Sequence, residues 1–325
     1  VSVVIPIGFQ NSGAEFTQAA GKLKVRLLQG NIPQDEKFIP GLGVQQALSW
    51  YGEQLLANTE PLVITPETAI PVLPQQLSPP YWQAIKNKYA PLLAQNQLAD
   101  QKPDQLSAPL PIGPQTALIG LPMGAAGVGY TNSALALGPE EVAYRYDKLH
   151  LVPFGEYVPF GDLMAKFGIY GFAASEGQGY SAGPGPLLLD LGPKIGRALP
   201  LICYEAVFPQ DVNAAPERPD LLVQITNDGW FGEISGPYQH LVQARFRAIE
   251  QGLPMVRVAN TGVSAMIDPQ GRVTAEIGLN TAGWVDAALS EPKGPTLYGR
   301  TGDWAIAAVV LLLLSAMFLR GRRLT

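Results

Sequence analysis

The sequence has very few residues that could crosslink the chain or ligate a metal ion. Its 325 residues include one cysteine, Cys203, and two histidines, His150 and His240. A single cysteine excludes a disulfide within the chain. We predict neither a cofactor nor a metal. The lone thiol in the stretch LPLICYEAVFP is therefore either a small core residue or a reactive group.

Charge is also scarce. Only 15% of the residues are charged, the formal net charge is -5, and the lysines and arginines form no basic stripe. Proteins that bind a phosphate backbone carry such a stripe, so nucleic acid is excluded as a partner. Hydrophobic residues make up 47% of the chain, which is high for a soluble enzyme with so few charges. We expect a monomer that has a membrane bilayer as one of its partners.

Long runs that are both uncharged and continuously apolar are absent except near the C-terminus. Residues 304–319, WAIAAVVLLLLSAMFL, carry no charge and are followed by RGRR. We predict a transmembrane helix over 303–320 and a cytoplasmic tail over 321–325, because positive residues favour the cytoplasmic side. Sixteen residues reach only about 24 Å against a hydrocarbon core of about 30 Å, so flanking Trp304 and the arginines must help. A buried core helix is the alternative.

The N-terminal residues lack an initiator methionine and a basic segment typical of a signal peptide. We interpret residues 1–23 as a linker from membrane helices that precede this chain. A catalytic domain over 24–298 would then lie outside the cytoplasm.

Short apolar runs that end in polar residues predict buried strands at 25–31, 62–68, 199–205 and 221–228. Apolar residues three and four apart predict helices at 44–59 and 238–251. Between 255 and 289, turn residues recur every eight to ten positions, which indicates antiparallel strands. The sequence therefore predicts an α/β fold with mixed β-sheets.

Two stretches, 73–114 and 158–186, show no regular pattern and are rich in proline, glycine, glutamine or aromatic residues. Long irregular segments in a compact domain are often functional. The second is apolar enough to act as a lid that covers an acyl chain or dips into a bilayer, with core packing as the alternative.

Polar residues at strand ends are the candidates for chemistry, because ligands of α/β sheets bind beyond the carboxyl ends of strands. Three groups of residues lie at the carboxyl ends of predicted strands: Glu67, the pair Cys203 and Glu205, and the pair Asn227 and Asp228. A cysteine nucleophile needs a base or a cation beside it. We interpret both histidines as structural, since neither lies in a recognisable triad motif.

A glutamate and a lysine can replace histidine. Glu67 in TPETAIP would take the thiol proton, and Lys148 in YDKLHLVPFGEYVP would lower the thiol pKa and stabilise an oxyanion. Each alone is more often a surface charge, and a buried cysteine is more often a packing residue.

In combination, Glu67, Lys148 and Cys203 resemble the Glu-Lys-Cys triad of the nitrilase superfamily. The sequence is most similar to the apolipoprotein N-acyltransferases, through LLQGNIPQ (27–34), HLVPFGEYVP (150–159), ICYE (202–205), NDGWFG (227–232), GPYQHLVQARFRAIE (236–250) and YGRTGDW (298–304). Phe38 stands where many relatives have tryptophan, and phenylalanine has no N–H to donate. The resemblance implies a nitrilase-like αββα sandwich of mixed β-sheets flanked by helices, followed by one transmembrane helix.

The resemblance also implies a ping-pong acyl transfer. Cys203 would take an acyl group from the sn-1 position of a phospholipid as a thioester. The acyl group would then pass to the α-amino group of a diacylglyceryl-cysteine at the N-terminus of an apolipoprotein. This places the protein in the bacterial inner membrane, with its catalytic domain on the periplasmic side.

The same resemblance implies roles for supporting residues. Glu156 and Glu205 would orient the lysine or gate the pocket, and the backbone N–H of Tyr204 would bind the oxyanion. Asn132 and Trp230, like Phe38, are candidates for the pocket wall. Two other interpretations stay open: a membrane-tethered amidase or nitrilase that hydrolyses small amides, and a degenerate scaffold without catalysis.

Overall fold

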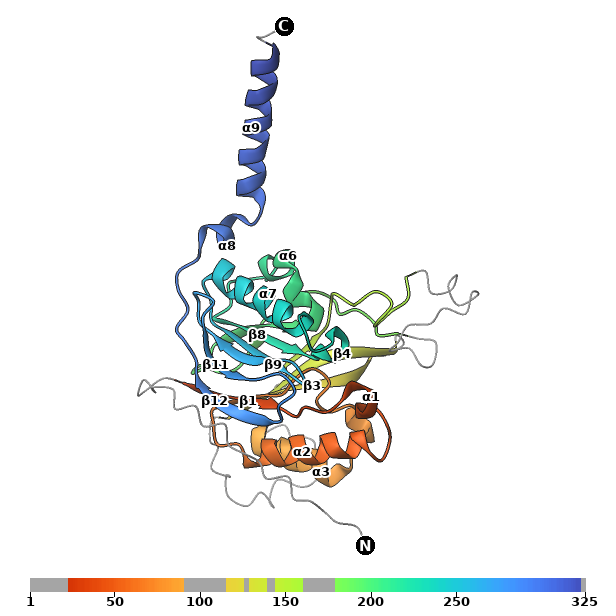
Figure 1. The fold of residues 1–325 in the computed structure, drawn as a ribbon. Coiled ribbons are helices and arrows are strands. Elements are labelled where there is room, and N and C mark those ends of the chain that lie inside the picture. Colours follow the sequence, from red (N-terminus) through yellow and green to blue (C-terminus); the bar gives the residue numbers. More distant parts are fainter. Residues whose placement is uncertain (1–22, 91–114, 126–128, 139–143, 160–178, 323–325) are drawn as a thin grey trace.

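A computed structural model describes residues 23–90, 115–125, 129–138, 144–159 and 179–322 (Figure 1). The strands of these residues form two six-stranded sheets. The first sheet has the order β12 (Gly283–Ala288), β1 (Lys24–Gln29), β2 (Leu62–Ile64), β3 (Thr116–Ala125), β4 (Gly129–Leu137) and β5 (Tyr144–Asp147). β1, β2 and β3 are parallel, and the outer pairs are antiparallel.

The second sheet has the order β11 (Val273–Ile277), β10 (Ser264–Ile267), β9 (Met255–Ala259), β8 (Leu221–Thr226), β7 (Arg197–Ile202) and β6 (Leu189–Asp190). β7, β8 and β9 are parallel, whereas β6, β10 and β11 pair antiparallel with their neighbours. The prediction of mixed sheets is confirmed; of the strands predicted to be antiparallel, β10, β11 and β12 are, whereas β9 pairs antiparallel with β10 and parallel with β8.

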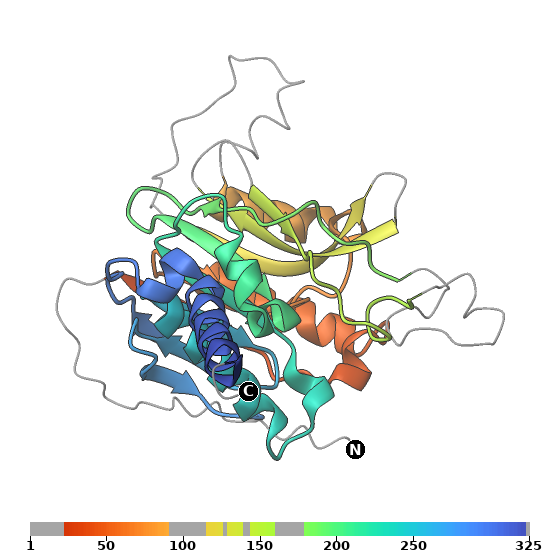
Figure 2. The same ribbon diagram turned by 90° about the horizontal axis from the view of Figure 1, so that it is seen from above.

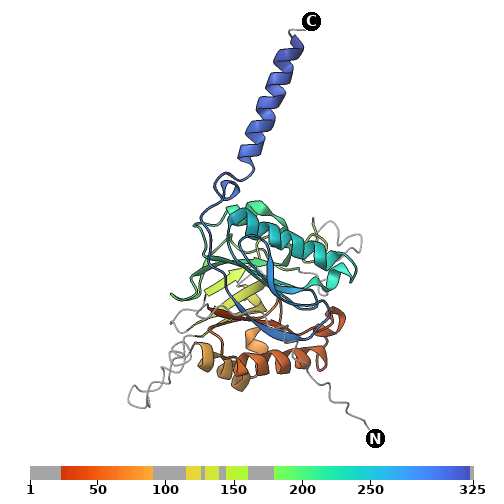
Figure 3. The same ribbon diagram turned by 60° about the vertical axis from the view of Figure 1, so that its left-hand side comes forward.

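The sheets pack face to face, with helices on both outer faces. α2 (Gly43–Ala57) and α3 (Pro79–Tyr89) cover the first sheet, while α6 (Pro209–Asn213) and α7 (Gly236–Gln251) cover the second (Figure 3). Successive residues of one strand enter different cores: Leu27 packs between the sheets and Leu28 packs under the helices. Strands buried on both faces read as continuous apolar runs. The predicted αββα sandwich is therefore confirmed.

The expectation of irregular structure over 73–114 is wrong in part, because α3 lies within it. Two prolines begin this helix, where a missing N–H does no harm, and Ile85 and Tyr89 bury one face at a spacing of four. A short 3-10 turn, Pro74–Gln76, precedes it. Most of the predicted lid, 160–178, lies outside the described residues, as do 1–22 of the predicted linker and 323–325 of the predicted tail.

The C-terminal segment leaves the sandwich through α8 (Leu297–Thr301) and continues as α9 (Trp304–Arg322), which projects away from the body (Figures 1 and 2). Its apolar side chains are exposed, among them Leu311 and Leu312. The predicted helix is present. Among the described residues, however, no helix is both long and apolar enough to cross a membrane, so the predicted transmembrane span is not confirmed.

Candidate active site

Glu67 lies in the turn after β2 and is 6% exposed. Its Oε1 accepts a hydrogen bond from Asn132 Nδ2 at 2.6 Å, and its Oε2 accepts one from the backbone N–H of Asn227 at 2.8 Å. Asn132 belongs to the first sheet, and Asn227 follows β8 of the second. The carboxylate is thus fixed from both sheets.

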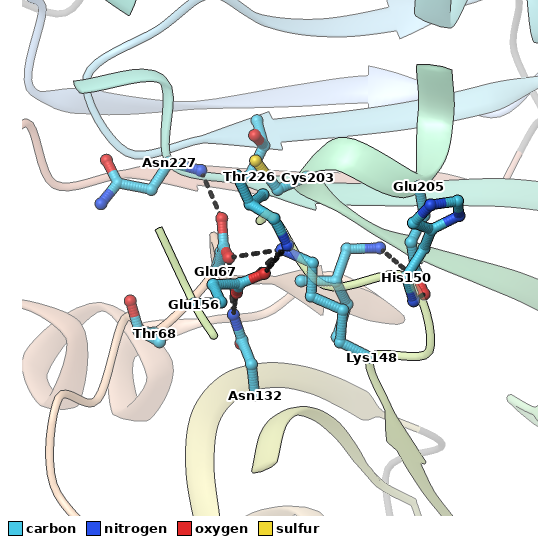
Figure 4. Close-up of polar contacts among 12 residues, drawn as sticks. Glu67, Thr68, Asn132, Lys148, His150, Glu156, Cys203, Glu205, Thr226 and Asn227 are labelled. Carbon is cyan, nitrogen blue, oxygen red and sulfur yellow. Dashed lines mark hydrogen bonds and ion pairs between the residues drawn. The ribbon is translucent and has the colours of Figure 1, made fainter. Parts of the chain in front are cut away.

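Lys148 follows β5 and is 1% exposed. Its Nζ lies 2.8 Å from Glu156 Oε2 and 3.6 Å from Glu67 Oε1 (Figure 4). Asn132 Nδ2 also donates to Glu156 Oε1 at 3.1 Å. The charged groups of Lys148 and Glu156 and the side-chain amide of Asn132 therefore form one network of polar contacts with the Glu67 carboxylate.

Cys203 begins a 3-10 turn, Cys203–Val207, at the end of β7. Its φ is +52°, a left-handed conformation that is rare for a residue with a side chain and common at functional sites. Its backbone carbonyl accepts from Gln224 Nε2 at 3.1 Å and lies 3.1 Å from His240 Nε2. Two buried side chains, Gln224 and His240, therefore contact the backbone of the strained turn.

Burial dominates the electrostatics of the thiol. Burial, together with the negative charge of Glu67, raises the pKa of Cys203, and the opposing effect of Lys148 is too small to reverse this. Burial alone would lower the pKa of Lys148, but Glu67, Cys203 and Glu156 raise it above its ordinary value. Lys148 does act to lower the pKa of the Cys203 thiol, as predicted, but burial and the charge of Glu67 outweigh it in the resting site. The thiol is protonated at neutral pH, and the lysine is charged.

A cavity of about 440 Å³ opens in front of these groups. Eight of the nine predicted site residues line it: Phe38, Glu67, Asn132, Lys148, Glu156, Cys203, Tyr204 and Trp230. Phe38 and Trp230 form its exposed end, where these residues are 43% and 55% exposed. The cavity therefore joins a buried charged floor to an apolar, accessible rim.

Glu205 is the ninth, and it lies beside the cavity lining. Its Oε1 accepts from the Tyr146 hydroxyl and the Leu149 N–H, both at 2.7 Å, and its Oε2 accepts from the Ile202 N–H at 2.6 Å. Burial raises its pKa. Glu205 ties the segment that carries Lys148 to the strand that carries Cys203, whereas Glu156 contacts the lysine itself.

The two histidines match their interpretation as structural residues. His150 stacks on Phe208, with ring centroids 3.8 Å apart, and pairs with Asp211 at 3.0 Å. His240 is buried and pairs with Asp228 at 2.8 Å.

The carbon-nitrogen hydrolase family model matches residues 46–293, a range that includes the whole cavity floor. The chain belongs to the carbon-nitrogen hydrolase family. Solved structures of this family share the fold: a CN-hydrolase superfamily protein from Xanthomonas campestris matches with a TM-score of 0.52 and 22% identity over 83% of this chain and 91% of that one. An amidase from Nesterenkonia sp. matches with a TM-score of 0.55 and 17% identity over 88% and 95%.

Within the carbon-nitrogen hydrolases, the curated relatives with high similarity are apolipoprotein N-acyltransferases, in agreement with the resemblance drawn from the sequence motifs. The protein from Rhodopseudomonas palustris is 39% identical over 94% of this chain and 55% of its own length. The protein from Verminephrobacter eiseniae is 42% identical over 87% and 48%. The chain therefore spans about half the length of these relatives.

Several residues of this carbon-nitrogen hydrolase site were not predicted from the sequence. Lys37, Gln34 and Thr68 lie behind or beside Glu67, and Gln224 lies under Cys203. Lysine and glutamine at such positions look like surface residues in a sequence. Lys37 had one usable signal, because it directly precedes Phe38, which the motif comparison singled out.

Proposed function

We propose that this protein is an N-acyltransferase that moves a fatty acyl group from a phospholipid, through a thioester on Cys203, to the N-terminal amine of an apolipoprotein. The observation that carries the proposal is the buried Cys203 sharing one cavity with Glu67 and Lys148, in a chain about 40% identical to apolipoprotein N-acyltransferases. The exposed apolar rim of that cavity suits a lipid donor.

In the first half-reaction, Glu67 takes the proton from the Cys203 thiol as the sulfur attacks the ester carbonyl carbon. Because the resting thiol is protonated, proton transfer and attack are coupled. The oxyanion of the tetrahedral intermediate is stabilised by Lys148 and by the backbone N–H of Tyr204. When the C–O bond breaks, Glu67 returns its proton to the leaving alkoxide, which departs as a lysophospholipid.

In the second half-reaction, the α-amino group of a diacylglyceryl-cysteine attacks the thioester carbonyl. Glu67 accepts a proton from the attacking nitrogen, and the C–S bond breaks with the sulfur regaining a proton. The products are an amide and the free thiol. Exclusion of water by a narrow, buried floor favours the amine over hydrolysis.

The remaining site residues support these steps. Glu156, the nearer of the two carboxylates, holds the Lys148 ammonium in place for the oxyanion, and together with Glu67 it keeps that ammonium charged. Asn132 holds Glu67 and Glu156 in register. Phe38 and Trp230 form the wall along which the acyl chain lies.

We also propose that the catalytic domain over 24–298 works at the bacterial inner membrane, on its periplasmic side. The exposed apolar side chains of α9 and the arginines from Arg320 onward support a lipid-facing C-terminus oriented by the positive-inside rule. On this proposal 1–23 is a linker, 158–186 covers the acyl chain, and 321–325 is cytoplasmic.

The test is a labelled phospholipid incubated with the detergent-solubilised protein, followed by mass spectrometry of the peptide that contains Cys203. We expect one acyl group on Cys203, its release by a diacylglyceryl-cysteine peptide, and no adduct in Cys203→Ser. An adduct of unchanged yield in that variant would refute the proposal. Ammonia release from small amides with no phospholipid requirement would favour an amidase instead.

A further inference from the structure

A second buried lysine, Lys37, contacts the segment that carries Glu67. Lys37 ends the four-residue helix α1 (Gln34–Lys37), and its side chain is completely buried. Its Nζ donates to the backbone carbonyl of Glu67 at 2.9 Å and to Thr68 Oγ1 at 2.8 Å. Both hydrogen bonds are made to the turn after β2, and neither involves the Glu67 carboxylate itself.

That turn needs an external support. Thr68 has a φ of +47°, which is unfavourable for a β-branched residue. On its other side the turn packs against Gly120, where a Cβ would overlap the Pro66 carbonyl oxygen. The turn is therefore strained, closely packed against Gly120 and hydrogen-bonded by Lys37.

The same helix also contacts the second sheet. Gln34, one helical turn before Lys37, accepts a hydrogen bond from the Asn227 side-chain amide, and the Asn227 backbone N–H donates to Glu67 Oε2 at 2.8 Å. Residues three apart lie on one face of a helix. α1 thus links the ends of β2 and β8, which belong to different sheets, at the point where both sheets hold the carboxylate.

We infer that Lys37 is a positioning residue for the general base: by fixing the Glu67 carbonyl and the Thr68 side chain, it sets the position of the Glu67 carboxylate against Cys203. This inference rests on the proposed role of Glu67. Lys37 does not line the cavity and does not touch the reacting atoms. Its effect should therefore appear in the rate of the chemical step and leave donor binding nearly unchanged.

The burial of Lys37 supports a functional role over a purely structural one. Burial lowers the pKa of its ammonium to about 7, with Glu67 as the nearby charge that opposes the shift. A buried ammonium group is unfavourable for the stability of the fold, and residues whose pKa is strongly shifted by burial cluster at functional sites.

The test compares Lys37→Met with a matched control, Lys88→Met. Lys88, on α3, also donates to two backbone carbonyls, those of Leu56 and Asn58, and none of these three residues lines the cavity. We expect Lys37→Met to slow Cys203 acylation at saturating donor by on the order of 10²-fold, the effect of misplacing a catalytic group by about 1 Å, with KM for the donor within about twofold. Lys88→Met should retain the wild-type acylation rate and have a melting temperature similar to that of Lys37→Met.

A double-mutant cycle with Glu67→Gln isolates the route of the effect. If Lys37 acts through Glu67, Lys37→Met will slow the Glu67→Gln protein by less than about threefold. A full 10²-fold loss in that background, or an unchanged rate in the single variant, would overturn the inference. So would an equal loss in Lys88→Met.

The cycle is run with two acyl donors, a phospholipid and a small activated aryl ester. If the wild-type protein forms a thioester from the aryl ester and none from the phospholipid, the proposed function fails. The positioning role of Lys37 is then still decided by the aryl ester rates.

Discussion

Lys37 should impose a pH dependence on stability that its replacement by methionine removes. Its ammonium has a pKa of about 7 in the folded protein, against 10.5 as the ordinary value, because it is buried. Between pH 7 and 10.5 the unfolded chain therefore binds more protons at this position than the folded chain does. The free energy of unfolding must rise with pH across that window.

The size of the effect comes from the shift. One pKa unit corresponds to about 1.4 kcal/mol, so the full shift amounts to about 5 kcal/mol, of which about 2 kcal/mol falls between pH 7 and pH 9. Lys37→Met keeps the apolar stem and has no proton to bind. The difference in unfolding free energy, wild type minus Lys37→Met, should therefore increase by about 2 kcal/mol from pH 7 to pH 9.

Urea denaturation of both proteins at several pH values, followed by circular dichroism in the same mild detergent, measures this difference. Every other titrating group is shared by the two proteins, so their pH dependence cancels in the subtraction. A difference that stays constant from pH 7 to 9 would show that the Lys37 ammonium is not destabilised by burial. A difference that falls with pH would contradict the predicted sign.

Three further predictions concern the site. After burial, the charge of Glu67 is the largest cause that raises the pKa of Cys203, and Glu67→Gln removes it. Iodoacetamide at pH 8 should therefore alkylate the thiol several-fold faster in this variant, while acyl transfer falls by at least 10²-fold. Slower alkylation would refute the effect of the Glu67 charge on the thiol pKa. Glu156→Gln should lower the pKa of Lys148 and slow thioester formation by on the order of 10²-fold, as measured by stopped-flow with an aryl ester. Glu205→Gln leaves buried N–H donors without an anionic acceptor, and should reduce the unfolding free energy in urea by about 1–3 kcal/mol; an unchanged value would contradict this.

Local patterns were enough to predict most of the fold. Strands buried on both faces need apolar side chains at most positions, so β7 and β8 stand out through the runs LPLI and LLV. Helices α2 and α7 each bury a single face, and their periodicity is visible without a partner. α3 was missed because its two leading prolines and its polar residues resemble a loop, and its packing on the first sheet stabilises it as a helix.

The candidate site was predictable where a residue follows a strand or belongs to a specific motif. Glu67 and Cys203 satisfy both conditions and Lys148 satisfies the second, and their catalytic roles stay predictions until the thioester is observed. The relative parts of Glu156 and Glu205 could not be ranked from the sequence, because both stand next to triad residues. Only the distances show that Glu156 contacts Lys148 and that Glu205 holds backbone N–H groups.

The layered α/β fold, the family and the three residues most suited to chemistry could all be inferred from the sequence, since each depends on patterns within short segments. The electrostatic state of the site and its supports depend on tertiary packing. The pKa of Cys203 rises because folding buries it beside Glu67, and Lys37 reaches the Glu67 turn because α1 closes across the ends of two sheets. Burial and contacts between distant segments arise only when the sheets pack, and no local pattern encodes them.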